Sequence, residues 1–81
     1  MNARRYEPSP DRARAIRQAR EWAHMSERDL ATALGYRTRT PVRAWEAAVR
    51  DPGPDMTARI AAATRVPVSS LLMPTPGGVT E

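Results

Sequence analysis

The chain has 81 residues, which is enough for one small domain, and a domain of this size is stable only if its core is compact. It has no cysteine and a single histidine, so a disulfide framework and a thiolate zinc site are excluded, and we expect no metal and no cofactor. No apolar run approaches the roughly 20 residues of a membrane span, and no signal peptide is visible, so a cytoplasmic location is expected. The net charge is +4 and all 13 basic residues are arginine, for which codon preference is a better explanation than function.

The two ends of the chain lack helical periodicity. Residues 1–8 carry Arg4 and Arg5 and are expected to form a flexible basic arm. Residues 74–81 are expected to form a flexible tail. The sequence therefore predicts one folded domain over residues 9–73.

The first helix is predicted to begin at Ser9 and to run to about residue 24. Ser9 is a good N-cap, and Pro10 suits the first helical position. Arg20 lies on the inner, apolar stripe of this helix and needs a buried partner. Trp22 lies off that stripe; we expect it to pack under the last helix, and a contact between subunits is the alternative.

A second helix is predicted to follow directly. Ser26 is its N-cap, and Asp29 occupies the capping-box position. Gly35 supplies the turn at its C-terminal end. Three residues form its inner face: Leu30, Ala31 and Leu34.

A third helix is predicted to begin near Thr38 or Thr40, with Thr40 as N-cap and Pro41 as the first helical residue. Projection at about 100° per residue defines two stripes on it. The buried stripe consists of Val42, Trp45 and Val49. The cationic stripe consists of Arg39, Arg43 and Arg50. Like charges on one stripe repel one another unless an anion satisfies them, and DNA is such an anion; a solvated charged face is the alternative.

The remaining chain predicts two more helices. The sequence Asp-Pro-Gly-Pro over residues 51–54 ends the third helix. A fourth helix is predicted to start at Asp55 or Thr57 and to end by Pro67, and a short last helix begins near residue 69. The predicted fold is all-α, a compact bundle of about five short helices with a helix-turn-helix.

A set of residues recurs in order along the chain: Arg20, Met25-Ser26, Leu30-Ala31, Leu34-Gly35, Val42, Trp45-Glu46, Pro54, Arg59-Ile60-Ala61 and the segment from Pro67 to Leu72. This set resembles the lambda-repressor-like helix-turn-helix family, also called the Xre or Cro/CI type, over residues 16–72. The resemblance implies that Arg20 and Glu46 form a structural ion pair, that Ala31 lets two helices cross closely and that Gly35 takes the turn conformation. It implies structural roles for Arg20, Glu46, Ala31, Gly35, Val42 and Trp45.

The sequence departs from the family pattern in three places. The spacing from Gly35 to Trp45 is one residue longer, so the turn or the start of the third helix must absorb the extra residue. Glu27 stands where the family usually has a glutamine that touches DNA, and its carboxylate would be repelled by phosphate. Thr64 and Arg65 replace the usual glycine near the end of the fourth helix.

The resemblance places the DNA-reading positions between residues 37 and 43, and with the flanking Arg50 the predicted contacts are Arg37, Thr38, Arg39, Thr40, Arg43 and Arg50. Arg39 and Arg43 are the first candidates for a bidentate grip on guanine, and Arg37 and Arg50 are better placed as phosphate contacts. Which of Arg37, Thr38 and Arg39 reaches a base stays open, and for Thr40 a simple capping role weighs equally. For Arg4 and Arg5, disorder is preferred over a minor-groove contact.

The predicted function is that of a sequence-specific, double-stranded DNA-binding transcriptional regulator of the bacterial cytoplasm or nucleoid, with repression as the favoured direction. A homodimer is expected if the operator is a palindrome. The alternative is an antitoxin-like or other protein-interaction module of the same fold that binds a partner protein. An enzyme is not expected, because the chain has no cysteine, one histidine and no glycine-rich phosphate loop.

Overall fold

The computed structural model describes residues 8–72, and within this range the chain forms five helices and no strand. In chain order they are α1 (Pro10–Trp22), α2 (Glu27–Ala33), α3 (Thr40–Glu46), α4 (Gly53–Thr64) and α5 (Ser69–Leu72). The predicted all-α class is thus confirmed. The predicted arm, apart from Pro8, and the predicted tail lie outside the described residues, so the domain boundaries stay predictions. No helix in the described range is long and apolar enough to cross a membrane.

Side-chain caps begin the first two helices as predicted. The Ser9 hydroxyl accepts a hydrogen bond from the Arg12 backbone N–H at 3.2 Å. In α2 the Ser26 hydroxyl accepts from the Asp29 N–H, and the Asp29 carboxylate accepts from the Ser26 N–H, both at 2.9 Å. These bonds satisfy backbone donors that a helix leaves unpaired at its N-terminus, and they fix where each helix starts.

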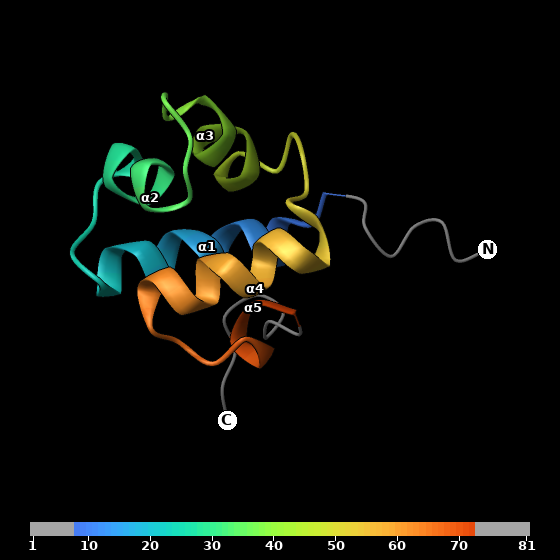
Figure 1. Ribbon diagram of the computed structural model, residues 1–81. Helices are drawn as coiled ribbons and strands as arrows, with labels where there is room; N and C mark the ends of the chain where they lie inside the picture. The colour runs from blue at the N-terminus through green and yellow to red at the C-terminus, as the bar shows by residue number, and fades with distance from the viewer. Residues whose placement is uncertain (1–7, 73–81) are drawn as a thin grey trace.

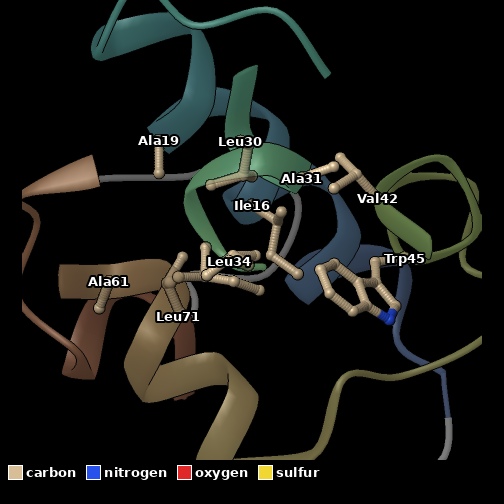
Figure 2. Close-up of a cluster of buried hydrophobic side chains, with 10 residues drawn as sticks. Ile16, Ala19, Leu30, Ala31, Leu34, Val42, Trp45, Ala61 and Leu71 are labelled. Carbon is tan, nitrogen blue, oxygen red and sulfur yellow. The ribbon is translucent and has the colours of Figure 1, made fainter. Parts of the chain in front are cut away.

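One apolar cluster joins all five helices. Figure 1 shows α2 and α3 together on one side of α1, with α4 and α5 on the other. Figure 2 shows side chains from these helices converging on a common interior. The cluster consists of Ile16, Ala19, Leu30, Ala31, Leu34, Val42, Trp45, Ile60, Ala61 and Leu71. The helix-turn-helix therefore packs through its inner face only and leaves the outer face of α3 exposed.

Four helices end in the same way, with a residue in the left-handed conformation. Gly35, at φ +93°, does this after α2, as predicted. Three residues other than glycine do the same: His24 after α1, Ala48 after α3 and Arg65 after α4, with φ of 59°, 60° and 63°. After each, a backbone N–H bonds back to a carbonyl five residues earlier in the chain, as in the Schellman motif. Arg65 thus occupies the conformation that the family's glycine would take.

The early end of α3 corrects two predictions. The helix stops at Glu46, because the chain turns through a left-handed residue two positions later. Val49 therefore does not continue the buried stripe and is 66% exposed. Arg50 lies beyond the helix, and Arg39 is its N-cap residue, so the predicted stripe of three arginines on one helix is wrong. Thr40 lies inside the helix and is not its N-cap.

The start of α4 is also earlier than predicted. The helix begins at Gly53, not at Asp55 or Thr57. The backbone N–H of Gly53 donates to the Asp51 carboxylate at 2.9 Å, and Asp51 also accepts from Arg12 at 2.7 Å. The 51–54 segment therefore links two helices tightly instead of acting only as a stop.

Trp22 is not packed under the last helix. Its side chain is 77% exposed, which contradicts the preferred prediction. It borders a hollow of about 300 Å³ between α1 and α5, which Leu71 also lines. The hollow leaves most of the indole in solvent.

Candidate nucleic-acid interface

The interface begins with the connection between α2 and α3. The Gly35 N–H donates to the Thr32 carbonyl at 3.0 Å, and the Tyr36 N–H donates to the Ala31 carbonyl at 2.9 Å, which closes the end of α2. Residues 36–39 then run outside any helix until α3 starts. Because α3 is regular from Thr40, the extra residue of this chain is absorbed in the turn.

Two contacts from the interior hold this turn in place. The rings of Tyr36 and Trp45 meet edge to face, with centroids 5.9 Å apart. An Arg59 guanidinium nitrogen, from α4, donates to the Leu34 carbonyl at 3.0 Å. The turn is therefore anchored to both α3 and α4, as a rigid recognition element requires.

A buried ion pair fixes α3 to α1. The Arg20 guanidinium donates to both carboxylate oxygens of Glu46, at 2.7 and 3.0 Å, and to the Met25 carbonyl at 2.9 Å. The hydrogen bond with Glu46 raises the pKa of Arg20, and burial of the guanidinium opposes this effect. This is the ion pair that the family resemblance implied. It accounts for an arginine on an apolar stripe and sets the orientation of α3.

The arginines divide into two groups by their partners. Within residues 8–72, the arginines paired with a carboxylate all lie on α1: Arg12, Arg14, Arg17 and Arg20. In contrast, the α2–α3 region presents exposed arginines for which the described part of the chain provides neither a hydrogen bond nor an ion pair: Arg28, Arg37, Arg39, Arg43 and Arg50. Positive charge is therefore left unneutralised on the face that carries the turn and α3.

The structure gathers some of the predicted contact residues and separates others. A hollow of about 420 Å³ is lined by Arg28, Arg37, Thr38 and Arg39. Thr40 and Arg43 lie on α3, outside this hollow, and Arg50 lies in the connection to α4. All six predicted residues are exposed.

Arg28 is the residue that sequence reasoning missed. It lies on the first turn of α2, on which only capping was considered, and only the fold brings it beside the turn that follows. Its signal in the sequence was its place directly after Glu27, in a helix whose inner face is defined by other residues.

The hydroxyl of Thr38 supports the start of α3. Its oxygen accepts a long hydrogen bond, 3.4 Å, from the Thr40 N–H. Arg39, the N-cap residue, provides no side-chain cap of its own. The capping role that was considered for Thr40 is thus taken in part by Thr38.

No sign of a catalytic or metal site appears in the described range. Residues 8–72 contain no group of three His, Cys, Asp or Glu side chains that could hold a metal ion. Every buried side-chain nitrogen or oxygen in this range has a hydrogen-bond partner. The chemistry of this face is that of exposed guanidinium and hydroxyl donors, which recognise anions.

Comparison with known proteins agrees with this geometry. The model of the helix-turn-helix family HTH_3 matches residues 16–71, which is more than half of the chain. Neither a curated protein nor a solved structure matches it. The family is one of DNA-binding domains that typically are not enzymes. The chain therefore belongs to the HTH_3 helix-turn-helix family, the lambda-repressor-like domains of the Xre and Cro/CI type.

Proposed function

We propose that this protein is a sequence-specific regulator of transcription that binds double-stranded DNA and acts as a repressor. The observation that carries the proposal is the set of arginines without carboxylate partners around the turn and α3. A cationic face that the protein itself does not neutralise favours a polyanion, because each phosphate contact releases condensed counterions.

The dimensions of α3 suit the major groove. The helix has seven residues, which corresponds to a length of about 10 Å. The major groove of B-DNA is about 12 Å wide and presents a distinct pattern of donors and acceptors for each base pair. The exposed side of α3 can therefore enter the groove while its buried side stays packed on α1.

The proposed DNA contacts are the six predicted residues, Arg37, Thr38, Arg39, Thr40, Arg43 and Arg50. Arg43 is the arginine on α3 itself and is the first choice for a bidentate contact with guanine O6 and N7. Arg50, in the connection after α3, suits a phosphate at the far side of the groove.

Selection from a random duplex pool at about 150 mM salt tests the proposal, with Arg43→Ala in parallel. We expect one enriched motif for the wild type and a relaxed preference at one base pair for the variant. Such a contact is worth about 1–3 kcal/mol of discrimination. If no motif is enriched, or if binding depends on salt alone, the sequence-specific function is wrong.

We further propose that the protein binds its operator as a homodimer, as a palindromic site would require. The support is the hollow between α1 and α5, bordered by the exposed Trp22. Val68 and Leu72 add exposed apolar surface at 39% each. Such surface on a small protein marks a protein contact.

The mass in solution, measured with and without operator DNA, tests the dimer. We expect two chains per operator for the wild type and one for Trp22→Ala, whose indole no longer contributes apolar area. A wild type that stays monomeric on its operator contradicts the dimer. In that case the antitoxin-like alternative, in which the hollow receives a different protein, becomes the better explanation of this surface.

A further inference from the structure

We propose that Arg28, Arg37 and Arg39 form one clamp for a single phosphate of the DNA backbone, so that Arg39 positions the domain and Arg43 reads the base. This inference rests on the proposed function and assigns separate tasks within the same interface. It adds Arg28 to the contacts, and it moves Arg39 from base recognition to phosphate binding.

The first argument is convergence. Arg28 comes from α2, and Arg37 and Arg39 come from the turn, yet the three line one hollow of about 420 Å³. No carboxylate lines the hollow, and none of the three has a hydrogen bond or an ion pair within the described range. Three guanidinium groups around one space repel one another until an anion enters it. Guanidinium forks match phosphate oxygens in shape and charge.

The second argument is the hydroxyl that lines the same hollow. The Thr38 oxygen accepts the hydrogen bond from the Thr40 N–H, so its own O–H is free to donate. A phosphodiester needs only donors, and the hollow provides only donors. A base edge would need acceptors as well at most positions.

The nearest acidic side chain does not compete for these arginines. Glu27 precedes Arg28 on α2, but it does not line the hollow. Its charge is one of the factors that raise the pKa of Arg20, so it lies within electrostatic reach of the buried pair between α1 and α3. The clamp is thus free of internal neutralisation.

The third argument is the place of Arg43. It lies on α3, one turn after Arg39, and it does not line the hollow. A clamp at the turn and a reader on the helix correspond to the usual division of labour, in which phosphate contacts fix the register and base contacts carry specificity.

The test is a scan of the selected operator in which each phosphate in turn is replaced by an uncharged methylphosphonate. For the wild type we expect one position, next to the turn, where replacement weakens binding about tenfold, as for one charge-assisted contact. In Arg28→Gln and in Arg39→Gln the sensitivity at that same position should disappear. In Arg43→Gln it should remain. Loss of sensitivity at two different phosphates in Arg28→Gln and Arg39→Gln would overturn the single clamp.

The salt dependence gives an independent readout. Combined substitution of Arg28, Arg37 and Arg39 by Gln should lower the slope of log Kobs against log salt by about 0.9, the value for one phosphate. A decrease near 2.7 would mean three separate phosphates and would overturn the clamp. Arg65→Gln is the matched control, since Arg65 is exposed and lies at the end of α4, and it should leave the slope unchanged.

Two further arms separate this inference from its foundations. If Arg39→Gln changes the selected motif, Arg39 reads a base and the inference fails while the proposed function stands. If the wild type selects no motif, the proposed function fails. Inorganic phosphate at 10 mM should weaken operator binding no more than chloride at equal ionic strength. A stronger effect would assign the hollow to a free phosphate ligand and overturn the proposal.

Discussion

At the scale of single residues, the structure depends on one buried charge and its partner. Arg20 makes three hydrogen bonds, two of them to Glu46, and both side chains are largely shielded from water. Removing one partner leaves a charge in an environment where it cannot be solvated. The pair could be anticipated from the sequence, because an arginine on an apolar stripe needs a buried acceptor.

Glu46→Ala is expected to lower the free energy of unfolding by about 3–5 kcal/mol, since it leaves the Arg20 guanidinium buried and unpaired. Urea denaturation measures this. Glu21→Ala is the control: it breaks the pair with Arg17, which is 3.5 Å long and exposed on both sides, and should cost less than about 1 kcal/mol. Equal effects of the two variants would show that the buried pair does not stabilise the fold.

The capping box of α2 predicts a specific dependence on pH. The hydrogen bond from the Ser26 backbone N–H, followed by that with the Ser26 hydroxyl, lowers the pKa of Asp29. Because the folded-state pKa is lowered, the contribution of Asp29 is present above the pKa of the unfolded chain, near 4, and is lost as the pH falls through the folded-state value.

Asp29→Asn should therefore lower the melting temperature at pH 7, and the difference from the wild type should shrink below about pH 4. Thermal melts from pH 7 to pH 2.5 measure it. Ser26→Ala, which keeps the carboxylate and its bond to the backbone, should retain part of this pH dependence. A difference that stays constant down to pH 2.5 would exclude a role for the Asp29 charge.

At the scale of the helix, the ends decide where the recognition element lies. Ala48 follows α3 in the left-handed conformation, which costs an L-residue with a side chain roughly 1–2 kcal/mol. Ala48→Gly removes this cost and is expected to raise the free energy of unfolding by about 1 kcal/mol. If α3 instead continued to residue 50, glycine would sit inside a helix and would lower stability by a similar amount. The sign of the change in a urea titration thus separates the two.

Gly35→Ala is the matched opposite of this variant. At φ +93°, an alanine is strained, although an added Cβ would meet no atom within 4 Å. The loss of stability should therefore come from the backbone alone and reach about 1–2 kcal/mol. Circular dichroism with urea measures both variants in one experiment. An unchanged stability for Gly35→Ala would show that the turn after α2 can relax to another conformation.

The contrast between these two turns shows how far the sequence predicts the fold and the site. Helix starts at Ser9 and Ser26 were predictable, because the caps are local hydrogen bonds. The end of α2 was predictable from Gly35. The end of α3 was not, since Ala48 is a strong helix former that tertiary packing holds in a left-handed turn. Arg28 escaped for a related reason: only the fold brings α2 beside the turn.

At the scale of the whole molecule, α1 is the element around which the others assemble. It packs against α3, α4 and α5. Arg12 on α1 donates to the Leu71 and Leu72 carbonyls at the end of α5 and to the carboxylate of Asp51, which is 4% exposed. One side chain thus joins the last helix, the connection after α3 and the first helix. No periodicity in the sequence points to this contact, because its partners are distant in the chain.

Arg12→Ala should therefore destabilise the domain far more than its exposure implies. We expect a loss of about 3 kcal/mol or more, because Asp51 keeps a buried charge. A domain of this size has a total stability of only about 4–12 kcal/mol. Arg14→Ala, which removes a neighbouring exposed arginine on the same helix, is the control and should cost less than about 1 kcal/mol. Comparable losses in the two variants would contradict the linking role of Arg12.

Replacement of both partners distinguishes a charge that must be neutralised from a contact that organises the fold. If the cost of Arg12→Ala comes mainly from the unpaired carboxylate, then adding Asp51→Asn should recover part of the loss, since no buried charge remains. Amide hydrogen exchange at Leu71 and Leu72 should nevertheless stay fast in the double variant, because their carbonyls have lost the guanidinium that held α5 against α1. Recovery of both stability and protection would mean that α5 is held by its apolar contacts alone. Recovery of stability without protection would show that Arg12 ties the last helix to the domain independently of its ion pair.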